Sequence, residues 1–155
     1  MPVIRLATDE DIPALLGLLK QVNLVHHLGR PDLFKLATKY GEKELKELLQ
    51  DNSKPVFVYE EDHTVYGHAF CVLQSVENNR LLEDRKTLYI DDICVDEKMH
   101  RKGIASALFQ HVQSYARSIG CYNITLNVWT CNPDAMQFYE KMGMLPQKIG
   151  MEQIL

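Results

Sequence analysis

Apolar residues follow two different spacings in the first third of the chain, and each spacing predicts a type of element. A short apolar run from Val3 to Leu6 predicts a strand, and apolar residues then recur every three or four positions from Ile12 to Val22, which predicts a helix. The pattern is irregular from Asn23 to Tyr40, where we expect loop and short helices. A second amphipathic helix is predicted to begin near Glu42.

The middle of the chain has the residue types of β-strands. Pro55 to Glu60 and Val65 to Gln74 are rich in β-branched and aromatic residues, and a short polar stretch separates them. A third run of this kind, Thr87 to Val95, follows a charged loop. Three consecutive strands without an intervening helix predict an antiparallel meander.

The last third returns to helical spacing. Apolar residues from Ile104 to Ile119 lie on one helical face, and Gly120 is expected to end that helix. Tyr122 to Trp129 is again typical of a strand. Asn132 and Pro133 are residue types that begin a helix, as N-cap and first-turn proline.

This last helix is expected to end at Gly143, after which Met144 to Leu155 predicts one or two short closing strands. The predicted order of elements is β-α-α-β-β-β-α-β-α-β, without internal repeats. Such an order predicts a mixed α/β fold in which a central sheet carries helices on both faces.

The composition is that of one ordinary globular domain, which we expect to cover residues 1–155. The chain is 46% hydrophobic and 25% charged, which excludes disordered and collagen-like classes. A net charge of −4 gives no general attraction to nucleic acid or to an anionic membrane. Because no apolar stretch approaches the length of a membrane span and no signal region opens the chain, we expect a cytoplasmic protein.

Cysteine and histidine spacing does not predict a metal site. The four cysteines form no CxxC pair, and His26 and His27 lack a third residue that would complete a set of ligands. We therefore expect reduced cysteines and no bound metal.

One segment carries a chemical signal, the loop before the Ile104–Ile119 helix. Gly103 and the small Ala105 stand at the helix start, where free backbone N–H groups and the positive end of the helix dipole favour an anion. Arg101 and Lys102 add positive charge. The segment therefore predicts a phosphate site, and an ordinary basic loop is the alternative. Two familiar phosphate motifs, GxxxxGK[ST] and GxGxxG, are absent.

Two motifs resemble the GNAT superfamily of acetyl-CoA-dependent N-acetyltransferases. Residues 100–105, His-Arg-Lys-Gly-Ile-Ala, resemble its phosphate loop Gln/Arg-x-x-Gly-x-Gly/Ala and depart from it at His100. A second family pattern, Asn-x-x-Ala-x-x-Phe-Tyr-x-x-x-Gly, is matched in full by Asn132, Ala135, Phe138, Tyr139 and Gly143. The predicted element order also fits that fold, so the resemblance covers essentially the whole chain.

The resemblance implies a sheet whose fourth and fifth strands diverge, with acetyl-CoA bound between them. The pantetheine arm would pair with the free backbone edge of Ile93, Cys94 and Val95, and Asn132 would contact the cofactor across the cleft. The departure at the first loop position would weaken a side-chain contact and leave the backbone cradle intact. The pyrophosphate would lie on His100, Arg101, Lys102, Gly103, Ile104, Ala105 and Ser106.

The resemblance also implies direct transfer of the acetyl group to an amine in a ternary complex. A backbone N–H of the Ile93–Cys94 region would donate to the thioester oxygen, and Tyr139 would protonate the leaving thiolate. Asp91 and Asp92 are the nearest carboxylates for taking the amine proton. Because strand neighbours point to opposite faces, only one of them is expected in the cleft unless a bulge intervenes. Tyr89 shares a face with Asp91 and is expected to line the acceptor pocket or hold a water molecule.

These residues also have structural alternatives. Tyr139 has apolar neighbours and would be a core aromatic without the second motif, and Asp91 and Asp92 would suit an ordinary polar strand end. Cys94 beside His100 suggests a thiol nucleophile, but direct transfer needs none and the strand position predicts burial.

The identity of the acceptor amine is left open by the sequence. In related folds the connection between the first two helices borders the acceptor site, so the candidates for substrate contact are His26, His27, Arg30 and Asp32. The stretch after Gly143 is short, and we therefore expect an acceptor cleft that is open or is completed by a second subunit in a homodimer. A small-molecule amine and a peptide amine both fit.

An N-acetyltransferase is favoured over two other classes of protein. A non-catalytic module that binds acyl-CoA as a sensor would share the phosphate loop and would tolerate the departure at His100. Nucleic-acid binding through Arg101 and Lys102 conflicts with the acidic net charge.

Overall fold

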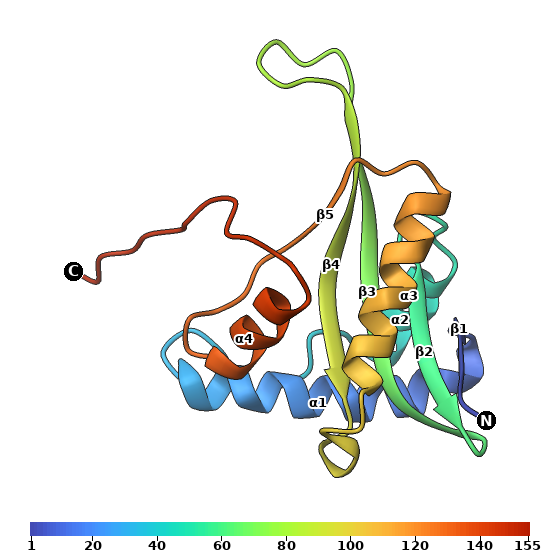
Figure 1. The fold of residues 1–155 in the computed structure, drawn as a ribbon. Helices are drawn as coiled ribbons and strands as arrows, with labels where there is room; N and C mark the ends of the chain where they lie inside the picture. Colours follow the sequence, from blue (N-terminus) through green and yellow to red (C-terminus); the bar gives the residue numbers. More distant parts are fainter.

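The computed structural model describes residues 1–155 and contains a five-stranded sheet in the order β1-β2-β3-β4-β5 (Figure 1). Neighbouring strands from β1 to β4 are antiparallel, and β5 runs parallel to β4. The predicted meander is therefore confirmed. The strands are β1 (Val3–Leu6), β2 (Val56–Glu61), β3 (Thr64–Val76), β4 (Arg85–Val95) and β5 (Asn123–Leu126).

Helices cover both faces of the sheet, as predicted (Figure 1). On one face, Leu15 and Leu19 of the first helix and Leu45 of the second pack against Val58 and Phe70 of the sheet. Each contributes apolar surface whose removal from water stabilises the fold. The α-helices are α1 (Ile12–Gly29), α2 (Glu42–Leu49), α3 (Ile104–Ser118) and α4 (Pro133–Lys141), and two short 3-10 helices cover Asp9–Asp11 and Glu97–Met99.

The opposite face is covered by α3 and α4. Leu108 and Val112, from the predicted apolar face of α3, are fully buried against Leu88 and Ile90 of β4. Because strand neighbours alternate between faces, these two β4 residues pack in this second core, while Tyr89 between them faces the α1 side of the sheet. Residues of α4 pack at the margin of the same core.

Local signals set several helix ends. The Thr8 N–H donates to Asp11 Oδ2 at 2.7 Å, which is the Thr-x-x-acid pattern before α1. The Asn132 side chain accepts from the Ala135 N–H at the start of α4. Gly120 and Gly143 follow α3 and α4 with φ of +79° and +99°, a left-handed conformation that favours glycine.

Three predicted boundaries are wrong. The first helix does not end at Val22 but continues to Gly29, because no glycine or proline lies between these two residues. The predicted strand Tyr122–Trp129 is regular only over β5, where it has β4 as its one neighbour. Met144–Leu155 forms no strand, because it leaves α4 and extends away from the sheet without a strand to pair with (Figure 1).

The predicted divergence of β4 and β5 is confirmed. Their pairing covers only Thr87–Ile90 with Asn123–Leu126. Beyond Ile90, β4 pairs with β3 alone, so its other backbone edge is free. This free edge, together with the α3 start below it, is where the fold can admit a ligand. No helix of the chain is both long and apolar enough to cross a membrane.

Candidate active site

A β-bulge in β4 breaks the alternation of side chains at the two aspartates. Phe70 of β3 lies opposite Asp92, and the next residue, Cys71, lies opposite Ile90. Asp91 is therefore an extra residue in β4. Because of it, Asp91 and Asp92 both lie on the α1 side of the sheet, whereas regular pairing would have separated them.

Asp91 is held by two residues from the connection between α1 and α2. Its Oδ1 lies 2.7 Å from Lys39 Nζ, and its Oδ2 accepts a hydrogen bond of 3.1 Å from the Tyr40 hydroxyl. The Tyr40 ring stacks on Phe70, which fixes the position of the phenol. Burial, and then the negative charge of Asp91, raises the pKa of Tyr40, so the phenol remains a donor.

Asp92 is paired with a fully buried histidine of β3. His68 Nε2 lies 2.6 Å from Asp92 Oδ2, and the ring packs edge-on against Phe70. His68 Nδ1 is buried without a hydrogen-bond partner. Because a carboxylate only accepts hydrogen bonds, the Nε2–H of His68 donates to Asp92. The contact fixes the orientation of Asp92.

Tyr139 lies on α4 and packs against the core on the α3 side of the sheet. Its ring packs against Phe109 and Phe138, with centroid distances of 6.2 and 5.2 Å. Burial, and then the charge of Asp92 and the neighbouring Cys94, raises the pKa of the Tyr139 phenol. Tyr139 is thus an aromatic packed at the core margin whose hydroxyl lies within electrostatic range of Asp92.

The free edge of β4 runs along Ile93, Cys94 and Val95. Cys94 is 8% exposed, and its thiol donates to the Leu18 carbonyl of α1 at 3.3 Å. Burial, and then the charge of Asp92, raises the pKa of this thiol, so it is not a nucleophile at neutral pH. The thiol points into the protein, and only the backbone of this segment is open at the edge.

The start of α3 has the geometry of an anion cradle. The first helical hydrogen bond runs from the Ala107 N–H to the Gly103 carbonyl, so the preceding amides, of Ile104, Ala105 and Ser106, have no helical acceptor. Gly103 has φ of +79°, and a Cβ built on it would meet no atom within 4 Å. The space in front of this backbone therefore fits a phosphate group.

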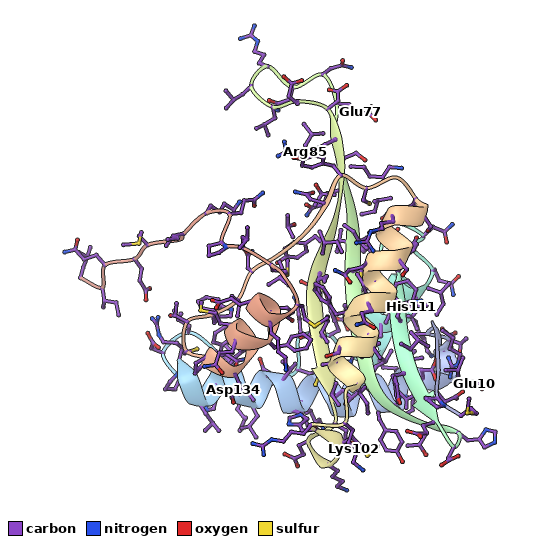
Figure 2. The ribbon with its side chains drawn as sticks, in the orientation of Figure 1. Glu10, Glu77, Arg85, Lys102, His111 and Asp134 are labelled. Carbon is purple, nitrogen blue, oxygen red and sulfur yellow. The ribbon has the colours of Figure 1, made fainter.

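Charged side chains extend from the same loop. Arg101, with φ of +65°, and Lys102 are both exposed, and Figure 2 shows Lys102 on the loop at the start of α3. The His100 ring nitrogen Nε2 lies 2.9 Å from the Val95 carbonyl, so this side chain ties the loop to the end of β4. Asn132 lies at the start of α4, beside Asp134 (Figure 2), and its side-chain oxygen is used as the helix cap.

The end of α1 and the connection after it form one wall near the aspartates. The His26 ring stacks on Phe34, whose ring in turn meets Trp129 edge-on, each at 5.0 Å between centroids. Burial lowers the pKa of His26, while Asp92 acts in the opposite direction. The His27 ring nitrogen lies 2.7 Å from the Phe34 carbonyl. These aromatic residues link α1 to the segment after β5.

Two other residues that were predicted to contact the substrate bind side chains of the protein itself. Arg30 binds Asp32 at 2.8 Å and Glu152 at 2.5 Å, so its guanidinium connects the end of α1 to the segment after α4. The Tyr89 hydroxyl accepts a hydrogen bond of 3.3 Å from Asn127. Tyr89 contributes to the raised pKa of Tyr40, which places it near the Asp91 group.

Sequence reasoning missed His68, Lys39 and Tyr40. His68 could have been noticed from the alternation in its strand, because it is two positions before Phe70 and shares its buried face. Lys39 and Tyr40 lie in a connection without periodicity, and nothing in their sequence neighbourhood indicates the contact with Asp91.

Four chemical features come from both faces of the sheet to the part of β4 that β5 leaves unpaired. They are two carboxylates, a protonated phenol, a strand edge with free backbone groups, and an anion cradle. Such a set can hold a phosphate-bearing molecule, attract a cationic group and move protons. No three histidine, cysteine, aspartate or glutamate side chains converge to hold a metal ion.

Comparison with known proteins finds relatives that are N-acetyltransferases. A glucosamine 6-phosphate N-acetyltransferase of Arabidopsis thaliana is 27% identical over 101 residues, which cover 56% of this chain and 66% of that protein. A probable N-acetyltransferase, san, of Drosophila melanogaster is 29% identical over 105 residues, which cover 67% of this chain and 53% of that protein. The matches thus span about half to two thirds of these relatives' lengths.

Solved structures share the fold. A tetramutant of the BH1408 protein from Bacillus halodurans has a TM-score of 0.95 at 30% identity, over 99% of both chains. The glucosamine-6-phosphate N-acetyltransferase from Arabidopsis thaliana has a TM-score of 0.73 at 20% identity, over 99% of this chain and 98% of that one, which is a likeness of fold. The model of the acetyltransferase (GNAT) family matches residues 22–144. On this match, and with the strand divergence that the family resemblance implied, the chain belongs to the GNAT family of acetyltransferases.

Proposed function

We propose that the protein transfers the acetyl group of acetyl-CoA to a primary amine, by direct attack of the amine in a ternary complex. Family membership and the N-acetyltransferases among its relatives support this class of reaction. The acceptor is an amine of a small molecule or of a peptide. The observation that carries the proposal is the β4 bulge, which directs Asp91 and Asp92 to one side beside the free strand edge.

The residues present fit acetyl-CoA, which supplies an acetyl thioester when bound. The free amides at the start of α3 would hold the pyrophosphate, and the exposed Arg101 and Lys102 would add charge. The edge of Ile93–Val95 that no strand pairs offers backbone groups for the amides of the pantetheine arm, apart from the Val95 carbonyl that His100 contacts, and an N–H of this segment would polarise the thioester carbonyl. Asn132 would contact the cofactor from α4.

The two aspartates would attract the positively charged acceptor amine and remove its proton. An alkylammonium has a pKa of about 10.4 and is not nucleophilic until it loses a proton. The side chains of Asp91 and Asp92 are 16% and 13% exposed, so both are reachable from solvent. Asp91 accepts the amine proton, directly or through water, and the charge of Asp92 favours the approach of the cation. His68 keeps Asp92 oriented.

Tyr139 completes the proton balance. The phenol carries a proton at neutral pH, and in this proposal it gives that proton to the leaving thiolate. The sulfur leaves more easily when it is protonated as the C–S bond breaks, because it then departs as a neutral thiol. Tyr139 is therefore the general acid in this proposal.

The test begins with ligand binding. Thermal unfolding is followed with and without acetyl-CoA, with a plain nucleotide as the control ligand. Acetyl-CoA at about 100 times its Kd should add about 2.7 kcal/mol to the free energy of unfolding and raise Tm by several degrees. Release of the CoA thiol is then measured with a panel of primary amines that includes a diamine, an amino sugar and a lysine peptide, each beside its hydroxyl analogue.

The panel also separates the enzyme from a non-catalytic sensor. An enzyme releases thiol only with one or more of the amines and not with their hydroxyl analogues. Stabilisation by acetyl-CoA without thiol release for any amine would contradict the proposal and favour the sensor. Absence of both would remove acetyl-CoA as the ligand.

A further inference from the structure

Lys39 places a primary amine of the protein itself against the carboxylate that the proposed reaction uses. Its Nζ lies 2.7 Å from Asp91 Oδ1 and 5.6 Å from the centre of the Tyr40 ring. The other oxygen of Asp91 accepts from the Tyr40 hydroxyl. The Lys39 ammonium therefore already occupies the position where an acceptor amine would give up its proton.

The backbone on both sides of Lys39 is anchored, although the segment contains no helix or strand. Asn23 of α1 donates through Nδ2 to the carbonyls of Lys35 and Ala37, the first at 2.9 Å. After Lys39, the Tyr40 carbonyl accepts 3.1 Å from the Thr38 hydroxyl. A fixed backbone presents the flexible lysine side chain to the sheet edge.

The ion pair itself is easily opened. The Lys39 side chain is 49% exposed, whereas that of Asp91 is 16% exposed. An ion pair with one partner in solvent contributes little to stability, so it does not lock the ammonium in place. Lys39 is also close enough to His26 to affect its pKa, which places it at the wall beside the aspartates. An exposed side chain in a weak ion pair fits a lysine that moves and reacts better than one that only stabilises the fold.

Resting on the proposed function, we propose that Lys39 is an internal acceptor that the protein acetylates in cis. Asp91 takes one proton from the Lys39 ammonium, and the free Nζ attacks the acetyl carbonyl. A C–N bond forms, the C–S bond breaks, and the CoA thiolate leaves with a proton from Tyr139. The nitrogen loses its second proton to become the amide, which restores the phenol, so the net products are acetyl-lysine, CoA thiol and one proton.

Acetylation would change the site. The neutral amide no longer pairs with Asp91, so this carboxylate becomes available to an external cationic amine. The modified protein, or Lys39→Gln as its mimic, should therefore have a lower KM for external amines than the unmodified protein.

The experiment follows site-specific acetylation by mass spectrometry after mixing the purified protein with acetyl-CoA. Lys35 and Lys43 are exposed lysines on either side and serve as internal controls. Because the reacting groups are held together, Lys39 should be modified about tenfold or more faster than either control. The first-order rate constant should not change on dilution of the protein. Asp91→Asn should slow the reaction, whereas Asp134→Asn, on exposed α4 surface (Figure 2), should not.

A second measurement needs no acetyl-CoA. In protein whose lysines carry isotope-labelled methyl groups, the Lys39 signal should shift in Asp91→Asn and stay in place in Asp134→Asn. Absence of that shift would show that the contact with Asp91 is not made in solution and would overturn the proposal.

The outcomes separate this inference from the proposed function. Thiol release with external amines, without preferential modification of Lys39, overturns the internal acceptor and leaves the enzyme intact. Equal modification of Lys35, Lys39 and Lys43 shows chemical acetylation only and also overturns it. If neither external amines nor Lys39 are acetylated, the proposed function fails as well.

Discussion

At the scale of single residues, Tyr139 decides whether the protein is a catalyst. Tyr139→Phe removes the proton donor and keeps the ring packing against Phe109, so kcat should fall by about 10²-fold or more with little change in the affinity for acetyl-CoA. Tyr115→Phe is a matched control, because its ring packs against Phe57 on the other side of α3. Equal kcat for wild type and Tyr139→Phe would contradict the assignment.

Two glycines at opposite ends of α3 test the anion cradle. Gly103 and Gly120 both have φ of +79° and open space around a built Cβ. Alanine at either position should therefore cost about 1–2 kcal/mol of stability. Only Gly103→Ala should also weaken acetyl-CoA binding, since only this glycine lies at the proposed phosphate site. Equal affinities of the two variants, measured by titration calorimetry, would exclude the cradle.

The sequence predicted the position of a residue correctly where that position depends only on its neighbours in the chain. Gly103, Asn132 and Gly143 act within one turn of a helix, where sequence spacing equals spatial spacing, and the structure has them at the predicted helix ends. Lys39 and His68 meet the aspartates across long sequence separations. Such contacts depend on tertiary packing, and no spacing rule contains them.

At the scale of elements, the strands and most helices followed from periodicity, but the bulge in β4 did not. A bulge is a property of the pairing between β3 and β4, and neither strand alone shows which residue is left over. For this reason the sequence left open which of Asp91 and Asp92 faces the site. The same limit explains the error for Met144–Leu155, whose apolar residues suit a strand that finds no partner within the fold.

The start of α1 is fixed to β1 by a charged cluster that makes stability depend on pH. Arg5 binds both oxygens of Asp11, at 2.8 and 3.0 Å, and also Glu60 at 3.0 Å. Burial would raise the pKa of Asp11, but hydrogen bonds from Arg5 and Thr8 outweigh it, and the net effect lowers the pKa. The stabilisation is therefore complete above the unfolded value of about 3.9 and is lost as the pH falls through the folded pKa.

Asp11→Asn should accordingly lower the free energy of unfolding by about 1–2 kcal/mol at pH 7, a figure reduced by the partial exposure of Arg5. The difference from wild type should begin to shrink below about pH 4, where the unfolded carboxylate takes up a proton, and should be lost once the pH falls below the lowered pKa of the folded state. Urea unfolding of wild type and Asp11→Asn, at pH 7 and at a pH below 4, measures the difference in the free energy of unfolding under each condition. An equal difference at both would show that the charge of Asp11 does not contribute.

At the scale of the whole molecule, the segment after α4 predicts self-association. Four of its apolar side chains are between 75% and 88% exposed, and Arg30 to Glu152 is its one ion pair with the body of the protein. Exposed apolar surface of this kind favours burial against another chain. We expect a homodimer in light scattering and a monomer after deletion of residues 146–155. A monomeric full chain at high concentration would contradict this expectation. The exposed side chains are Leu145, Ile149, Met151 and Ile154.

The ratio of acetylated amine to released thiol tests the proposed transfer of an acetyl group to an amine. The protein is mixed with isotope-labelled acetyl-CoA and the best amine of the panel, and the acetylated amine and the free thiol are quantified together. We expect one acetylated amine for each thiol released, at a rate that depends on intact Asp91 and Tyr139. Thiol release without acetylated amine, or no release with any amine, would contradict it.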